Sequence, residues 1–406
     1  MNKTNWARMC LALLLLIFSF NVSAQKTFKN PILPGFHPDP SICRVENDYY
    51  MVTSSFEWFP GLPIFHSKDL VNWEQIGHVL DRPSQLQMKD GLKASNGLWA
   101  PTIRYHQGTY YVICTATGCG GNFFVTADSP EGPYSEPIFI KDAPGIDPSL
   151  FFDEDGTMWY CGSINGDNKI PPRRYPAEDR IYVQQLDPST GQFIGERHIV
   201  SSGYAINSPY AEAPHIYKIK GKYYLMIAEG GTWENHAVSV FTADNIVGPY
   251  TPFICNPVLT HRHLGNDIDI TTIGHADLVQ TQNGDRYSVM LGVRPVNGFN
   301  MLGRETFLTP VEFQGEQPIF NPGVGRVLME EQFPKLPECP VIKPDNRDEF
   351  NGQSLAYCWN FLRTPFEKWY ELKDSKLQIN LRPQRVSELV NPSLIARRVE
   401  HHKFYT

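Results

Sequence analysis

The sequence has little positive charge. Its 406 residues include 36 Lys and Arg against 43 Asp and Glu, which gives a formal net charge of −7. A chain without a basic surplus cannot neutralise the phosphates of a nucleic acid. The balance therefore argues against a nucleic-acid partner and fits a neutral ligand such as a sugar.

Apart from one N-terminal stretch, the sequence also lacks a long apolar run. Lys3 and Arg8 accompany an apolar segment from Met9 to Phe20, and Val22-Ser23-Ala24 offers small residues for cleavage. This segment is shorter than a membrane-spanning helix, which needs about 20 residues. We expect residues 1–24 to be a signal peptide, with a secreted or periplasmic mature protein that has no membrane span. An uncleaved anchor helix is the alternative.

Cysteines are too few and too scattered for a disulfide scaffold. The chain has eight, of which one lies in the leader, so an odd number would remain after cleavage. No Cys and His spacing resembles a zinc site. We expect Cys114 and Cys119 to be free thiols, and we expect no metal site of this kind and no required cofactor.

Aromatic residues and turn formers are abundant, and they recur in a repeat. Aromatics make up 13% of the chain, which also has 31 Gly and 33 Pro. Five segments share a short strand, a polar turn and a second strand that carries aromatic residues; they are Asp39–Tyr50, Ala100–Tyr111, Asp147–Tyr160, Ala213–Tyr224 and Ala276–Tyr287. The repeat predicts an all-β, five-bladed β-propeller over residues 27–325. A β-sandwich with hairpins that look alike by chance is the alternative.

Three acids stand at or beside the starts of these repeats. Asp39 and Asp147 occupy the start itself, and Glu212 lies one place before the fourth start. In a propeller the inner strands surround one axis, so these side chains should converge. Crowded, buried carboxyl groups raise one another's pKa, which suits acid and base chemistry. A capping role before proline is the alternative for each acid taken alone.

Several motifs resemble those of glycoside hydrolase family 43. They are Pro34-Gly-Phe-His-Pro-Asp-Pro-Ser-Ile42, Asn96-Gly-Leu-Trp-Ala-Pro-Thr-Ile103, Gly145-Ile-Asp-Pro-Ser-Leu150, Ala211-Glu-Ala-Pro-His215 and Gly303-Arg-Glu-Thr306. Within the family the chain resembles β-xylosidases that carry a C-terminal β-sandwich. The resemblance implies that Asp39 is the general base, Glu212 the general acid, and Asp147 the residue that orients the acid and keeps its pKa high. It also implies inversion, for which the acid and base stand about 6.5–9.5 Å apart.

The resemblance implies four substrate-binding residues around these acids. Trp99 would stack on the sugar, and Phe56 would line the subsite; core packing is the alternative for both. Arg294 would reach Asp147 and the substrate, in preference to Arg304, which we expect to be structural. His275 would lie below the site. Two roles are open for it: contact with a structural calcium or sodium ion near the axis, or simple packing in the core.

The last part of the chain changes in character. Residues 326–344 are rich in proline and predict a linker, and residues 345–406 resemble the opening strands of the family's sandwich domain. The roughly sixty residues in that part are fewer than the roughly 100 of a compact sandwich. We therefore expect an incomplete β-sandwich domain.

The expected function is release of terminal β-1,4-linked xylose from a small xylo-oligosaccharide. Release of α-L-arabinofuranose, or both activities together, is an alternative, because the two sugars present similar hydroxyl groups. A propeller that binds sugar without catalysis is a further alternative, although a binding protein would not need all three acids.

Overall fold

A computed structural model describes residues 26–164, 173–205, 207–265, 267–342 and 347–403. The predicted signal peptide, residues 1–24, lies outside the described residues. The described chain consists of strands and loops. Over these residues the protein forms no helix with the length and apolar character that crossing a membrane requires.

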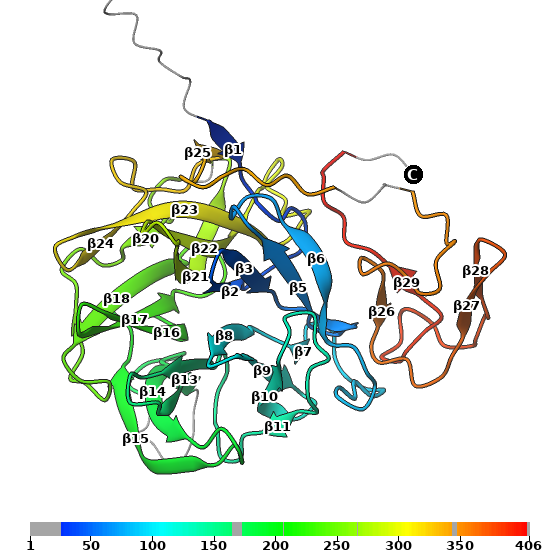
Figure 1. Cartoon of the computed structure of the whole chain (residues 1–406), viewed down its shortest axis with the longest axis horizontal. Helices are drawn as coiled ribbons and strands as arrows, with labels where there is room; N and C mark the ends of the chain where they lie inside the picture. The colour runs from blue at the N-terminus through cyan, green and yellow to red at the C-terminus, as the bar shows by residue number, and fades with distance from the viewer. Residues whose placement is uncertain (1–25, 165–172, 206, 266, 343–346, 404–406) are drawn as a thin grey trace, which may run out of the picture.

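Five antiparallel sheets form a ring of blades around a central axis (Figure 1). The first contains β2 (Ser41–Val45), β3 (Asp48–Val52), β5 (Gly61–Ser67) and β6 (Glu74–Leu80). The second contains β8 (Thr102–His106), β9 (Thr109–Thr117), β10 (Gly121–Ala127) and β11 (Ile138–Phe139), with β7 (Gly97–Leu98) also paired to β9. The third contains β12 (Ser149–Phe152), β13 (Met158–Ile164), β14 (Arg180–Leu186) and β15 (Phe193–Ser201).

The last two blades follow the same order. The fourth contains β16 (Glu212–Ile219), β17 (Lys222–Glu229), β18 (Ala237–Ala243) and β19 (Thr251–Pro252), with β20 (Leu259–Thr260) also paired to β18. The fifth contains β21 (Thr271–Gln280), β22 (Arg286–Val293), β23 (Glu305–Gln314) and β24 (Gln317–Phe320). Each predicted repeat forms the innermost hairpin of one blade. The predicted five-bladed propeller is confirmed.

Apolar side chains hold neighbouring blades together. Five buried clusters exist, and each combines residues of two adjacent blades, so every gap in the ring has its own core. The repeated aromatic residues lie in these gaps; Tyr49 and Tyr160, for example, have no exposed surface. Full burial of a large apolar side chain contributes about 1.5–3 kcal/mol. The repeat in the sequence is therefore a repeat of inter-blade packing.

All seven described cysteines, Cys114 and Cys119 among them, are free thiols.

The chain before the first blade is bonded to the last blade, which closes the ring. The side-chain amide of Asn30 donates to the carbonyl of Leu308 at 2.9 Å and accepts from the N–H of the same residue at 3.0 Å. Strand β1 (Thr27–Lys29) pairs with β25 (Glu330–Gln332). Because β25 lies within residues 326–344, this part of the predicted linker contains a strand, formed where β1 offers it backbone partners.

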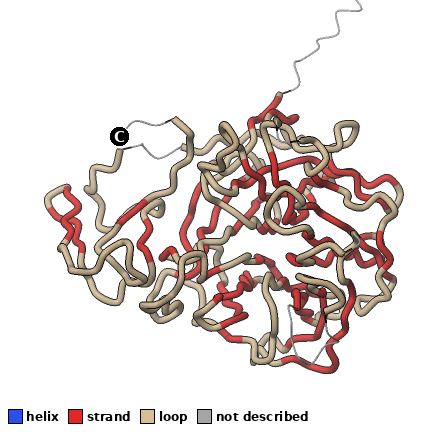
Figure 2. The backbone as a smooth tube through the Cα atoms, turned by 180° about the vertical axis from the view of Figure 1, so that it is seen from behind, coloured by secondary structure: helices blue, strands red, loops and turns tan. Residues whose placement is uncertain are grey.

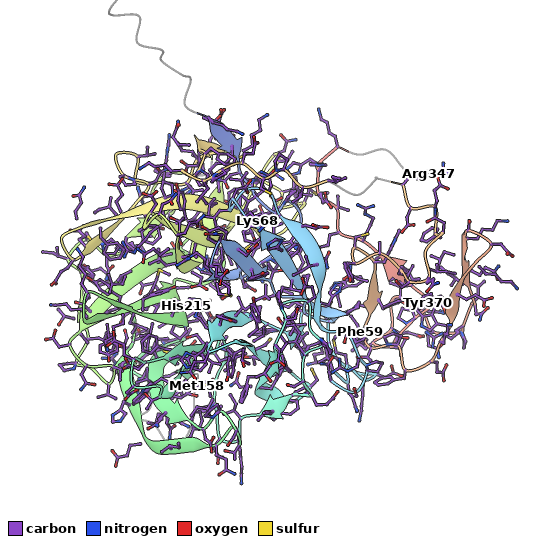
Figure 3. All side chains as sticks on the ribbon, viewed as in Figure 1. Phe59, Lys68, Met158, His215, Arg347 and Tyr370 are labelled. Atoms are coloured by element: carbon purple, nitrogen blue, oxygen red, sulfur yellow. The ribbon has the colours of Figure 1, made fainter. Side chains whose placement is uncertain are left out.

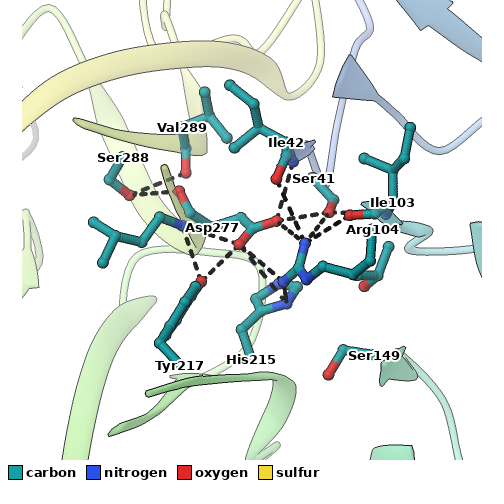
Figure 4. A network of polar contacts seen from close by, with 12 residues as sticks. Ser41, Ile42, Ile103, Arg104, Ser149, His215, Tyr217, Asp277, Ser288 and Val289 are labelled. Carbon is teal, nitrogen blue, oxygen red and sulfur yellow. Dashed lines mark hydrogen bonds and ion pairs between the residues drawn. The ribbon is translucent and has the colours of Figure 1, made fainter. Parts of the chain in front are cut away.

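A buried polar network at the propeller axis joins four blades (Figure 4). Asp277 of β21 accepts hydrogen bonds from Arg104 Nη1 at 2.9 Å, Ser41 Oγ at 2.6 Å and Tyr217 Oη at 2.6 Å. His215 Nδ1 lies 2.9 Å from Arg104 Nη2. Burial alone would raise the pKa of Asp277, but the charge of Arg104, with His215 and the hydrogen bonds, lowers it well below the usual range.

The C-terminal segment lies beside the first two blades (Figures 1 and 2). Its strands are β26 (Asn360–Leu362), β27 (Tyr370–Lys373), β28 (Lys376–Ile379) and β29 (Ile395–Ala396). Strand β26 pairs on one side with β29 and on the other with β4 (Trp58–Phe59), which belongs to the propeller part of the chain. Phe59, labelled with Tyr370 in Figure 3, marks this junction. One small sheet thus spans the two parts of the molecule.

Replacing Asp277 with Asn should destabilise the fold by about 3–5 kcal/mol at pH 7, because the buried Arg104 guanidinium would lose its counter-charge. The lowered pKa means that this stabilisation is present above the unfolded-state pKa and is lost as the pH falls through the folded-state pKa. Urea unfolding measures the difference. Asp244→Asn, at a side chain that is 91% exposed, is the control. Equal midpoints for the two variants would contradict the role given to the network.

Candidate active site

Asp39, Asp147 and Glu212 lie in one cavity of about 390 Å³ at the propeller axis. Asp39 precedes β2, Asp147 precedes β12, and Glu212 is the first residue of β16. They are 4%, 7% and 8% exposed, so the cavity holds three buried carboxyl groups. The ring brings together side chains that are far apart in the sequence, as the repeat predicts.

The backbone at these positions takes a conformation that few residues adopt. Asp39, Asp147 and Ala213 have φ values of 55°, 53° and 49°, and His275 of the fifth blade has 51°. The first three each precede a proline, which lacks an N–H and is tolerated at a strand start. Non-glycine residues in the left-handed region carry strain that tends to occur at functional sites. Four blades thus have a left-handed residue at the inner strand beside the cavity; two of these residues are acids, and a third, Ala213, directly follows Glu212.

Asp39 is held by two charged or polar donors. Arg304 Nη1 donates to Oδ1 at 2.6 Å, and Ser54 Oγ donates to Oδ2 at 2.6 Å. His275 Nδ1 lies 3.8 Å from Oδ1, beyond hydrogen-bonding distance. Charge-assisted hydrogen bonds of this length fix the orientation of a carboxylate. Asp39 is therefore positioned as an acceptor at the base of the cavity.

The other two acids are shifted toward their protonated forms. Burial and then the charge of Asp39 raise the pKa of Asp147 to about 8. Burial, followed by the charges of Asp147 and Asp39, raises the pKa of Glu212 well above its usual value. Arg304 opposes both shifts without cancelling them. The cavity can therefore hold a proton on one of these two acids at neutral pH, as general acid catalysis requires.

The two aromatic residues that the sequence predicts at the site, Trp99 and Phe56, both line the cavity. The indole N–H of Trp99 donates to the carbonyl of Ser95 at 2.8 Å, which sets the direction of its ring. Phe56 stacks on Phe36 with 5.6 Å between ring centroids, and the guanidinium of Arg304 lies 5.5 Å from its ring. Phe56 thus combines core packing with a place in the cavity wall.

The preference for Arg294 over Arg304 is corrected by the structure. Arg294 forms two hydrogen bonds, at 2.6 and 2.7 Å, with the buried carboxylate of Glu305 rather than with Asp147. Arg304 lies in the cavity and bonds to Asp39. The two arginines are ten residues apart in the sequence, on either side of the turn between β22 and β23, and local sequence does not distinguish which one points inward.

His275 lines the cavity, and burial lowers the pKa of its ring, which is neutral at pH 7. The nearby carboxylate of Asp277 is already bonded to Arg104, Ser41 and Tyr217. Among the described residues, no group of three or more His, Cys, Asp or Glu side chains could hold a metal ion.

Several cavity residues are not among the predicted site residues, and three of them carry acidic or aromatic side chains that could contact a ligand. These three are Asp179, Tyr210 and Trp233. Asp179 accepts a hydrogen bond from Arg173 at 2.7 Å, and burial raises its pKa. All three lie outside the repeated strand-start position, on segments whose length differs from blade to blade. The pattern that locates the three catalytic candidates therefore carries no signal for them.

A propeller with three carboxyl groups and a guanidinium in its central cavity has the groups that cleavage of a glycosidic bond requires. Residues 28–318 match the family described as glycosyl hydrolases family 43, and residues 347–406 match the beta xylosidase C-terminal concanavalin A-like domain. The chain belongs to glycosyl hydrolases family 43 and is a glycoside hydrolase. The resemblance inferred from its motifs is confirmed.

Individual relatives support this assignment. A "Xylosidase/arabinosidase" of Butyrivibrio fibrisolvens is 43% identical over 92% of this chain and 73% of its own length. A "Non-reducing end alpha-L-arabinofuranosidase BoGH43B" of Bacteroides ovatus is 42% identical over 96% of this chain and 72% of its own length. The crystal structure of a xylan beta-1,4-xylosidase from Bacillus halodurans superimposes with a TM-score of 0.85, at 37% identity, over 92% of this chain and 72% of that one.

Exchanging each arginine for lysine should separate their roles, because lysine keeps the charge and loses the planar fork. Arg304→Lys should lower kcat/KM by about 10–100-fold with an unchanged unfolding midpoint, since one charge-assisted bond to Asp39 is worth about 1.5–3 kcal/mol. Arg294→Lys should instead lower the free energy of unfolding by a similar amount and spare activity. Steady-state kinetics and urea unfolding of both variants test this. The reverse pattern would restore Arg294 to the site.

Proposed function

We propose that the protein is an inverting exo-acting β-xylosidase that releases the terminal β-1,4-linked xylose of a small xylo-oligosaccharide. The observation that carries the proposal is the contrast within one cavity. Asp39 is bonded to Arg304 and Ser54, whereas the pKa values of Glu212 and Asp147 are raised. The names of several relatives, xylosidases among them, support xylose as the sugar.

In the proposed reaction Glu212 acts as the general acid. Its carboxyl proton passes to the glycosidic oxygen as the bond from that oxygen to the anomeric carbon breaks. Asp39 acts as the general base and takes a proton from the water that attacks the anomeric carbon from the opposite face. The products are xylose of inverted configuration and a shortened oligosaccharide. Exchange of protons with solvent then returns both carboxyl groups to their starting states.

Asp147 is proposed to keep the proton on Glu212. After burial, the charge of Asp147 is the largest influence that raises the pKa of Glu212. Asp147 itself has a raised pKa because of burial and of Asp39. The charges of Asp147 and Asp39 therefore both favour the protonated form of Glu212. The proposed steps use these side chains and water only.

A second candidate is release of α-L-arabinofuranose. It is favoured by the name of the Bacteroides ovatus relative, which is an arabinofuranosidase, and by the joint name of the Butyrivibrio relative. The same three carboxyl groups would serve either sugar. The specificity then depends on the shape of the cavity around Trp99 and Phe56 rather than on the catalytic groups.

The proposal is tested by incubating the protein with xylobiose and following the products by NMR. Inversion should release α-xylose first, before mutarotation. The same preparation is assayed with the nitrophenyl glycosides of β-xylose and α-L-arabinofuranose, and the faster one identifies the sugar. Asp39→Asn should lower kcat by about 10²–10⁴-fold, the usual contribution of a general base. The exposed Asp128, changed to Asn, is the control. Initial release of the β-anomer, or full activity in Asp39→Asn, would overturn the mechanism.

The pH profile tests the proposed role of Asp147. In the native protein kcat/KM should fall on the alkaline side, because Glu212 is inactive as an acid once its proton leaves. Asp147→Asn removes a negative charge that raises the pKa of Glu212, so the alkaline limb should move to lower pH. A limb that stays in place or moves upward would show that Asp147 does not control the proton. Glu212→Gln should lose the limb together with most activity.

We also propose export of the protein, on the basis of residues 1–24, with Gln25 as the first residue of the mature chain. Polymeric plant sugars are met outside the cytoplasm, which suits a secreted or periplasmic hydrolase. N-terminal sequencing of the protein from its native host tests the cleavage; an intact Met1 would refute it.

A further inference from the structure

Trp233 stands at the mouth of the active-site cavity. It belongs to the loop of residues 230–236, which joins β17 to β18, and it lines the same cavity as the three acids. Its side chain is 44% exposed, whereas the three acids are almost fully buried. The acids therefore occupy the floor of the cavity, and the indole of Trp233 lies at the rim.

The backbone of this loop can hold the indole only because two glycines precede it. Gly230 has φ +91°, and a Cβ there would lie 2.2 Å from the carbonyl oxygen of Asn235. Gly231 has φ +77°, and a Cβ there would lie 2.5 Å from carbon atoms of the Trp233 ring. The indole thus rests directly on Gly231, where any side chain would displace it. Two backbone bonds, from Trp233 N to Gly231 O at 2.9 Å and from His236 N to Trp233 O at 3.0 Å, tighten the turn.

The loop is also tied to the segment that carries Glu212. Gly230 N donates to the carbonyl of Pro209 at 2.9 Å. The ring of Tyr210 meets that of Trp233 edge to face, with centroids 5.5 Å apart at 84°. Tyr210 precedes Glu212 by two residues and lines the cavity as well. Trp233 is therefore positioned on the side of the cavity to which Glu212 belongs, and its ring orientation is set by contacts on two sides.

An exposed aromatic face beside a catalytic cavity is a surface that a ligand can cover. Burial of apolar surface yields about 25 cal/mol per Å², and the C–H faces of a pyranose ring are apolar. The sugar whose bond is cut must reach the acids at the floor. The group that leaves must extend from the proton donor Glu212 toward the rim. The unit attached through the cleaved bond would then lie against Trp233.

We propose that Trp233 is the stacking platform for the first sugar unit on the leaving-group side, and that it sets a preference for oligosaccharides over glycosides with a small leaving group. This inference rests on the proposed function, because it takes Glu212 as the acid and a xylo-oligosaccharide as the substrate. Trp233 determines specificity by touching the substrate and takes no part in proton transfer. The Gly230-Gly231 pair allows the backbone conformation that positions the ring of Trp233.

The test compares xylobiose with β-xylosyl fluoride, whose leaving group has no ring to stack. Trp233→Ala should lower kcat/KM for xylobiose by about tenfold, a typical worth of an aromatic contact. It should leave the value for xylosyl fluoride within about twofold, since both substrates place the same sugar at the floor. Trp233→Phe, which keeps a flat ring, should restore most of the xylobiose activity. Phe366→Ala, at a side chain that is 54% exposed on the C-terminal segment, is the matched control.

The outcomes separate the two proposals. If the native protein cleaves neither substrate, the proposed function fails. If it cleaves both and Trp233→Ala lowers neither, or lowers both equally, the proposed function stands and the inference about Trp233 is overturned. Hydrolysis of the fluoride at the native rate also shows that the variant is folded, so a selective loss on xylobiose cannot arise from misfolding.

Discussion

The molecule depends on the closure of its ring. Each blade buries its faces only against two neighbours, so the first and last blades must meet or leave two apolar faces in water. Here the first and fifth blades share a buried cluster. The side-chain amide of Asn30 also bonds to the backbone N–H and carbonyl of Leu308, as a neighbouring strand would. At the centre, where the inner strands approach one another, polar rather than apolar groups fill the space around Asp277. Apolar packing holds the circumference, and one satisfied ion pair holds the axis.

Closure of the ring also brings the three carboxyl groups close enough to influence one another's pKa. Strand starts from the first, third and fourth blades meet at the axis, and each brings a buried carboxyl group into the cavity. Charges that would be unremarkable on the surface then act strongly on one another. Arg304 bonds directly to Asp39 alone, which makes the three acids unequal. A site with one carboxylate bonded to Arg304 and two carboxyl groups of raised pKa arises from the same position of two blades and the adjacent position of a third.

The C-terminal segment reinforces this cavity from outside. Its strand β26 pairs with β4, and the N–H of Arg363 donates to the carbonyl of Glu57 at 2.8 Å. The guanidinium of Arg363 donates to the carbonyl of Leu92. Glu57 follows Phe56 directly, and its carboxylate accepts from the N–H of Ser95, another cavity residue. The added segment thus supports two loops that form one wall of the active site.

The sequence by itself determined the number of blades and grouped the three acids. Both follow from the repeat, because each repeat is one blade and the acids lie at or beside the repeat starts. Asp39, Asp147 and Glu212 could be grouped from their register alone, and Trp99 and Phe56 were found from motifs beside it. Only the tertiary structure decided between Arg294 and Arg304, since the partner of Arg304 is 265 residues away. It alone revealed Tyr210 and Trp233, which lie on loops without a common period, and the pairing of β26 with β4. A repeat specifies what is equivalent in each blade. The residues beyond the repeat lie on loops that differ from blade to blade, and the positions of these loops are set by packing between distant segments of the chain.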